Sequence, residues 1–234
     1  MKNKQQWRQR SWFKPTMIMV GVVLIITAVE LAVHRPFGNF FSALLHKTAV
    51  RTFDMEQIVT AADPYLGDQS APVKIVEFAD FNCPYCRAAY PVVREVLSEY
   101  QASEVFFQFR DFPVVAASSV WLAMAGSCAH EQNKFWPFHD KLFLRQGQVT
   151  ESNIGQLAQT AGLNVDSFQR CLDGEKYRNE VADDYLSAEN NAVDGTPTFF
   201  INGLMFQGVP EKENLIKIID HFLSTQDSKV KTEK

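Results

Sequence analysis

The stretch FADFNCPYCRAAYPVV, residues 78–93, holds two cysteines that are separated by only two residues. A short apolar run rich in Val, Ile and Phe leads into it, which is typical of a buried strand. After the cysteines the spacing of apolar residues becomes helical. The sequence therefore predicts that Cys83 ends a strand and begins a helix, in which Pro91 should produce a kink.

Cys83 is expected to be the N-cap residue of this helix. Pro84 suits the first helical position, where a missing N–H group costs nothing. An N-cap side chain faces free backbone amides, here those of Tyr85 and Cys86, and the positive helix end favours an anion. Both effects predict that the pKa of the Cys83 thiol lies below its ordinary value of about 8.5. Cys86 should be more buried and less acidic, so Cys83 would attack and Cys86 would resolve.

A pair of cysteines with this spacing serves a redox centre, a metal site or a structural disulfide. A zinc site needs four ligands, whereas Cys128 and Cys171 are single and far apart in the sequence, and His130 near Cys128 is a lone histidine. A structural disulfide that closes so small a loop would constrain the unfolded chain very little. The strand-to-helix setting favours a redox pair. We expect neither a metal nor a cofactor.

The start of the chain predicts a membrane segment. The first fourteen residues carry five basic side chains and no acidic one, and the apolar segment 16–33 follows. This arrangement is typical of an uncleaved membrane anchor or a cleaved signal peptide. Small residues are missing where cleavage would require them, which favours the anchor. We therefore expect residues 1–15 in the cytoplasm, residues 16–33 as a transmembrane signal-anchor in the plasma membrane, and the rest outside the cytoplasm, in the periplasm or an equivalent space.

The remaining segments suggest one main domain with a linker and a tail. Residues 34–62 have helical periodicity and are expected to form a stalk or linker, or a helix packed on the domain; a self-association helix is the weaker alternative. The turn-rich residues 63–72 mark the start of the domain. Residues 225–234 are expected to form a disordered polar tail. The formal net charge of −4 becomes more negative without the basic start, which argues against nucleic-acid binding.

The predicted domain alternates strands with helices. The first strand and helix around the cysteine pair are followed by a second strand, a long helical block, a hairpin of two strands and a closing helix. The tight turn Asn202–Gly203 is the strongest hairpin signal. The predicted ranges are strand 73–81, strand 104–112, helical block 114–191, strands 195–203 and 204–209, and helix 214–224.

Three motifs occur in one order around the helical block: EFADFNCPYCRAAYP, CAHEQNKFWPFHDKLF and GTPTFFING. Together they resemble the DsbA-like thiol–disulfide oxidoreductases of the thioredoxin superfamily, over residues 63–224. The resemblance implies an α/β, thioredoxin-like fold with a helical insertion. It also implies that the CPYC motif faces a cis-proline loop, here Thr196–Pro197, and that Pro197 helps to hold the substrate. Glu77 matches the buried acid of the family, which would relay protons to Cys86; the alternative is an ordinary residue at the sheet end.

The resemblance also bears on the second cysteine pair and on Tyr85. Relatives with cysteines at similar places imply a structural disulfide between Cys128 and Cys171, and the alternative is two unpaired, buried thiols. An even number of cysteines in an exported domain favours disulfides. Tyr85 stands where the strongest oxidants of the family carry His. Tyr occurs at this place in related oxidases, reductases and isomerases alike.

We expect a membrane-anchored thiol–disulfide oxidoreductase that acts, first of all, as a dithiol oxidase. Its partners would be exported proteins that contain cysteines and a membrane redox protein that re-oxidises the Cys83–Cys86 pair. One alternative is a disulfide reductase or isomerase on the same fold. The other is a non-catalytic module, a metal chaperone or a holdase, in which the CPYC cysteines act as ligands.

Overall fold

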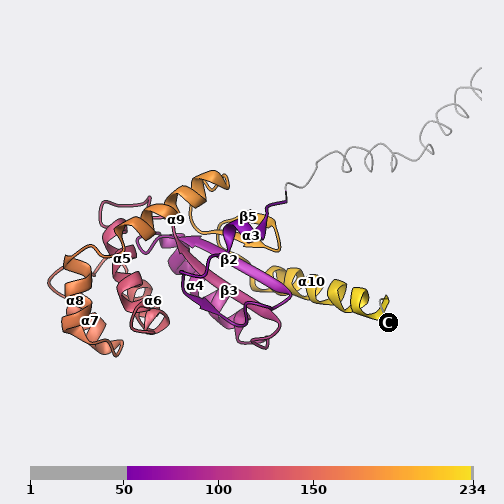
Figure 1. Ribbon diagram of the computed structural model, residues 1–234, viewed down its shortest axis with the longest axis horizontal. Coiled ribbons are helices and arrows are strands. Elements are labelled where there is room, and N and C mark those ends of the chain that lie inside the picture. Colours follow the sequence, from indigo (N-terminus) through magenta and orange to yellow (C-terminus); the bar gives the residue numbers. More distant parts are fainter. Residues whose placement is uncertain (1–51, 233–234) are drawn as a thin grey trace, which may run out of the picture. The chain divides into compact units, whose positions relative to one another are not determined.

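The computed structural model describes residues 52–232 (Figure 1). The predicted segments 1–15 and 16–33 and most of the predicted stalk 34–62 lie outside the described residues. Among the helices of the described part, none is both long enough and apolar enough to cross a membrane.

A mixed β-sheet forms the centre of the domain. Within the described residues it has five strands in the order β1-β3-β2-β4-β5. Strands β2 and β3 run parallel, and every other neighbouring pair is antiparallel. Four of the strands match predicted ones, while β1, only two residues long, was missed. The strands are β1 (Tyr65–Leu66), β2 (Val73–Ala79), β3 (Val105–Asp111), β4 (Thr198–Ile201) and β5 (Leu204–Gln207).

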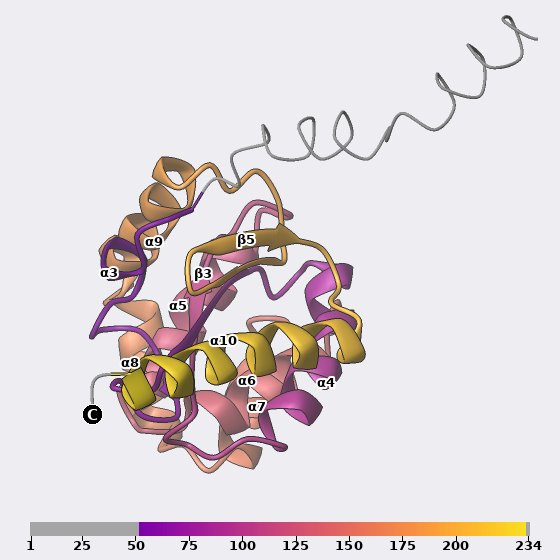
Figure 2. The same ribbon diagram turned by 90° about the vertical axis from the view of Figure 1, so that its right-hand side faces the viewer.

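Helices α4 (Pro84–Leu97) and α10 (Lys212–Thr232) cover one face of the sheet. In Figure 2, α10 runs across the front of the domain with α4 beside it. Since side chains alternate along a strand, every second residue of β2 points to these helices, and Val73 and Ile75 are buried in the same cluster as residues of both helices. Helix α4 continues past Pro91. Helix α10 extends to Thr232, past residue 225, where the sequence predicts that a polar tail begins.

Helices α3 (Met55–Ile58) and α9 (Arg178–Asn190) pack on the opposite face. The described end of the predicted stalk lies here as well. The backbone N–H of Phe53 donates to the carbonyl of Gly203 over 2.9 Å, and the Phe53 ring meets that of Phe200 edge-on. This end of the segment is therefore part of the domain rather than a free stalk.

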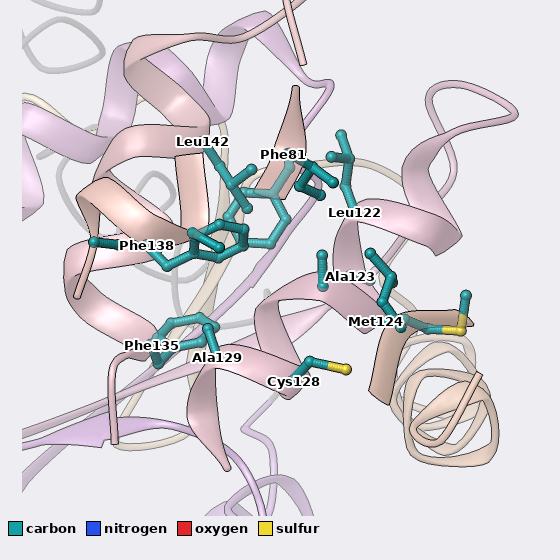
Figure 3. Packing of buried hydrophobic residues seen from close by; sticks show 14 of the residues in the cluster. Phe81, Leu122, Ala123, Met124, Cys128, Ala129, Phe135, Phe138 and Leu142 are labelled. Atoms are coloured by element: carbon teal, nitrogen blue, oxygen red, sulfur yellow. The ribbon is translucent and has the colours of Figure 1, made fainter. Parts of the chain in front are cut away.

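The predicted helical insertion lies between β3 and β4 and forms a second core. Figure 1 shows α5 to α8 grouped on one side of the sheet, away from α10. Phe81, from the turn before the cysteine pair, lies among Leu122, Phe138 and Leu142 of this group (Figure 3). Most aromatic residues of helix α6 lie in this core, although Trp136 is only half-buried. The helices are α5 (Ser119–His130), α6 (Phe135–Leu144), α7 (Ile154–Thr160), α8 (Val165–Asp173) and α9.

A disulfide joins α5 to α8 within the insertion. It links Cys128 to Cys171, whose Cα atoms lie 5.9 Å apart, across a sequence separation of 43 residues. Both cysteines belong to the core cluster of the insertion, so this bond ties two helices of that core together. Both cysteines also lie far from the CPYC turn in the sequence.

Candidate active site

The CPYC motif forms the turn from β2 into α4. Cys83 is the N-cap residue, with extended backbone angles, and Pro84 opens the helix, as predicted. Cys83 and Cys86 are both buried thiols. The Cys83 thiol donates to the backbone carbonyl oxygen of Thr196 over 3.2 Å. The Thr196–Pro197 peptide bond is cis, so the loop expected to face the motif does lie against Cys83.

The surroundings of Cys83 lower the pKa of its thiol to about 5. The largest cause is the hydrogen bond from the Cys86 thiol, and burial opposes it. The Thr196 hydroxyl and the backbone N–H groups of Cys86 and Tyr85 contribute less. The expectation of an acidic thiol therefore holds, but the helix amides on which we based it are a minor cause. Sequence reasoning had overlooked the Cys86 thiol as a donor.

Thr196 supplies a second reason for a thiolate at Cys83. Its hydroxyl oxygen is buried and has no hydrogen-bond partner among the described residues. A buried hydroxyl without a partner costs free energy. A thiolate at Cys83 would accept a hydrogen bond from this hydroxyl, so ionisation of Cys83 would satisfy a group that is otherwise unpaired.

The surroundings that lower the pKa of Cys83 raise the pKa values of Cys86 and Glu77. Burial is the main cause that raises the pKa of Cys86 far above its ordinary value, and its hydrogen bond to Cys83 and the charge of Glu77 add to this. Burial also raises the pKa of Glu77 to about 8, with a smaller contribution from Cys83. Glu77 therefore holds a proton at neutral pH beside a thiol that does not ionise.

The structure separates the predicted site residues into three groups. Glu77, Cys83, Cys86 and the Thr196–Pro197 loop come together. Tyr85 is 64% exposed, whereas the two cysteines that flank it in the motif are buried. The Cys128–Cys171 disulfide lies in the helical insertion and is not part of this group. Within the described residues, no three His, Cys, Asp or Glu side chains lie close enough together to hold a metal ion.

Sequence reasoning missed the side chains that fasten the turn. The Asp80 carboxylate accepts from the backbone N–H groups of Val114 and Val115, each over 2.8 Å. The Asn82 amide donates to the hydroxyl of Ser119 over 3.0 Å. Asp and Asn within the three residues before an N-cap are typical turn residues, which could have signalled a role. A third side chain, the Gln146 amide, reaches the turn from the end of α6 without any such signal.

The fold and this turn agree with a family model described as "Thioredoxin", which matches residues 60–221. The chain belongs to the thioredoxin family. It is 30% identical over 176 residues to the probable disulfide bond formation protein D of Bacillus cereus, an alignment that covers 70% of this chain and 81% of that protein. The crystal structure of oxidised BdbD from Bacillus subtilis matches with a TM-score of 0.64 at 25% identity, covering 70% of this chain and 94% of that one.

A second kind of relative contains a similar domain within a much longer chain. The Na(+)/H(+) antiporter NhaA 3 of Salinispora tropica is 36% identical over 148 residues, which are 62% of this chain. The chain spans only 22% of the length of that antiporter. The similarity to these antiporters is therefore confined to one domain, and it gives no reason to assign a transport activity to this chain.

Proposed function

We propose that the protein is a thiol–disulfide oxidoreductase that exchanges disulfides through Cys83 and Cys86. The observation that carries the proposal is the contrast within the pair: the pKa of Cys83 is lowered and that of Cys86 is raised, beside the Thr196–Pro197 loop. One thiolate that attacks and one thiol that stays protonated are what a redox pair requires. The similarity to proteins described as disulfide-bond formation proteins supports the same chemistry.

In the oxidising direction the reaction begins with a disulfide between Cys83 and Cys86. A substrate thiolate attacks the Cys83 sulfur, the bond to Cys86 breaks, and Cys86 takes up a proton. Glu77, protonated at neutral pH and close to Cys86, is the group we assign to deliver it. A second substrate thiolate then attacks the substrate sulfur of the mixed disulfide, and Cys83 leaves as a thiolate. Two electrons pass from the substrate dithiol to the enzyme pair.

The acidic Cys83 favours the oxidase over the reductase. A thiol of low pKa is a good leaving group, and a stabilised thiolate favours the reduced form of the pair. A pair whose reduced form is stabilised takes electrons from its substrates readily. Tyr85 does not contradict this direction, since the hydrogen bond from Cys86 already supplies the largest share of the stabilisation.

We further propose that the domain works outside the cytoplasm on exported proteins that contain cysteines. The basic first residues and the apolar segment 16–33 support a membrane anchor. The Cys128–Cys171 disulfide supports an oxidising compartment, because such bonds rarely persist in the cytosol. A membrane redox protein would then re-oxidise the Cys83–Cys86 pair after each turnover.

The test combines the reduction potential of the pair with two single variants. We expect Cys83→Ser to lose peptide-thiol oxidation completely and Cys86→Ser to accumulate mixed disulfides with its substrate on Cys83. A potential near that of strong oxidants, about −120 mV, supports the oxidase, whereas one near that of thioredoxin, about −270 mV, supports the reductase. Exchange that survives in Cys83→Ser, or adducts found on Cys86 by mass spectrometry, would contradict the roles assigned here.

A further inference from the structure

Gln146 connects the helical insertion to the backbone of the CPYC turn. Its side-chain Nε2 donates to two carbonyl oxygens, that of Phe81 over 2.9 Å and that of Cys83 over 2.8 Å. The side chain is half-buried, whereas its neighbours Leu144, Arg145 and Gly147 are exposed. An amide nitrogen carries two hydrogens, so one group satisfies both carbonyls.

The end of α6 places Gln146 at this point. Its backbone N–H donates to the carbonyl of Phe143 over 3.3 Å, as in a final helical turn. Gly147 follows with φ +77°, in the left-handed region that glycine adopts at little cost. The N–H of Gln148 then closes the turn on Arg145 over 2.9 Å. The chain therefore reverses directly after Gln146.

We propose that Gln146 is a positioning residue for Cys83, a role that rests on the proposed function. Asp80 and Asn82 fasten the turn through their own side chains, before Cys83 is reached. Gln146 is the side chain that hydrogen-bonds the carbonyl of Cys83 itself. The same carbonyl accepts from Arg87 in the first turn of α4, so Gln146 orients the peptide plane that joins Cys83 to the helix.

This orientation matters because the Cys83 thiolate depends on short contacts. The largest cause of its low pKa is the hydrogen bond from the Cys86 thiol, and Thr196 contributes on the other side. Both partners belong to other parts of the backbone, one turn along α4 and in the cis-proline loop. A small rotation of the Cys83 peptide plane would lengthen these contacts and weaken the stabilisation of the thiolate.

The test measures the pKa of Cys83 in the reduced protein from the rate of iodoacetamide alkylation against pH, with mass spectrometry to assign the site. Gln146→Leu keeps much of the volume and removes both donors; we expect the Cys83 pKa to rise by about one unit, so that roughly tenfold less thiolate forms at acidic pH. Gln146→Glu should raise it further at neutral pH, since a carboxylate cannot donate and repels both carbonyls.

Gln148→Leu is the matched control. It makes the same substitution two residues further along, where the side chain lines a hollow with Val149 and Leu157, and we expect no change in the Cys83 pKa. Thermal melts report folding, and if Gln146→Leu does not fold, Gln146→Glu decides alone. An unchanged Cys83 pKa in a folded Gln146 variant would overturn the positioning role and leave the proposed function standing. A wild-type Cys83 that is not acidic would overturn both.

Discussion

Two buried groups of ionisable side chains lie on opposite faces of the same two strands. On the face covered by α4, Glu77 of β2 lies near Cys83 and Cys86. On the other face, Arg110 of β3 is paired with two carboxylates. Glu77 and Arg110 are each less than a tenth exposed. The difference between the two groups lies in how their charges are balanced.

The Arg110 group satisfies its charges internally. The guanidinium lies 3.0 Å from the Asp63 carboxylate, donates from Nε to Asp184 over 2.9 Å and donates to the carbonyl of Ile58 over 2.7 Å. Burial raises the pKa of Asp63, and a proton on Asp63 leaves one positive and one negative charge in the group. The contacts join the segment before β1, strand β3 and helix α9. This arrangement therefore ties three separate parts of the chain together around one buried cation.

The Cys83 group has no such balance. Burial and Cys83 both raise the pKa of Glu77, and no cation among the described residues offsets them. At neutral pH, Glu77 and Cys86 therefore stay protonated, whereas Cys83 is a thiolate. A buried charge next to a counterion is structural here, whereas a buried charge without one becomes a site of proton and electron transfer.

The largest effect on stability should follow from removing the cation. In Arg110→Met the buried carboxyl groups of Asp63 and Asp184 are left without their cation, and breaking a buried ion pair in this way destabilises a protein by about 3–5 kcal/mol. Denaturant unfolding of the oxidised protein at neutral pH measures the loss. The destabilisation should shrink as the pH falls, because protonation of the carboxylate removes the unpaired charge. The Cys83 pKa should not change, since the affected group lies on the other face of the sheet.

Arg178→Met provides the control for this prediction. Arg178 pairs with Glu175 at the surface, where solvent screens the charges, and its loss should leave the unfolding midpoint unchanged. Equal midpoints for the Arg110 and Arg178 variants would show that the buried pair contributes no more than a surface pair. A shift of the Cys83 pKa in folded Arg110→Met would mean that the two faces are coupled and that our comparison is wrong.

The second test concerns the disulfide of the insertion, which belongs to neither group. Replacing both Cys128 and Cys171 with Ala should destabilise the protein by about 4 kcal/mol, the value expected from loop closure across their separation of 43 residues. Thiol exchange by Cys83 should persist below the new melting temperature. Two free thiols in the oxidised wild type, found by non-reducing peptide mapping, would rule out the bond. Lost exchange in a folded double variant would instead make this pair a redox relay.

The sequence predicts the parts of the fold that local patterns encode. The apolar strand before Cys83, Pro84 at the start of the helix and the Asn202–Gly203 turn each follow from neighbouring residues, and four strands and the insertion lie where these patterns place them. The cis-proline loop came from the resemblance of three motifs. Strand β1 was missed because two residues at a sheet edge carry no periodic signal.

The remainder of the site depends on contacts that no local pattern contains. Arg110 and Asp184 lie 74 residues apart, and Gln146 lies 63 residues from Cys83, so only the folded chain brings them together. The cause of the low Cys83 pKa was misjudged for a similar reason. The motif shows that Cys86 is near, but its role as the main hydrogen-bond donor depends on side-chain geometry that the spacing does not fix.

The smallest effect, and the sharpest test of the comparison, is the pH dependence that Glu77 contributes. Its pKa rises from 4.5 to about 8 on folding, so the folded protein retains a proton that the unfolded chain loses. Glu77 therefore lowers stability progressively as the pH rises from about 4.5 to 8, at about 1.4 kcal/mol per unit or about 3 kcal/mol at pH 7. Glu77→Gln removes this dependence.

Cys83 acts with the opposite sign in the reduced protein. Its pKa falls from 9.0 to about 5 on folding, so its contribution to stability is complete above pH 9 and is lost as the pH falls towards 5. The two slopes oppose each other between pH 5 and 8. Relative to the wild type, reduced Glu77→Gln should thus become steadily more stable as the pH rises through this range, which unfolding by denaturant at several pH values measures.

The oxidised protein separates the two contributions. A disulfide does not titrate, so only the Glu77 slope remains, and the stability of the oxidised wild type should fall relative to oxidised Glu77→Gln between pH 4.5 and 8. Burial is the main cause of the raised Glu77 pKa, and the Cys83 charge is the smaller one. The difference in pH dependence between wild type and Glu77→Gln should therefore persist in the oxidised protein, reduced only by the contribution of the Cys83 charge. If wild type and Glu77→Gln have the same pH dependence in both redox states, Glu77 is ionised in the folded protein. It could then not deliver a proton to Cys86, and the contrast between a balanced and an unbalanced face of the sheet would fail.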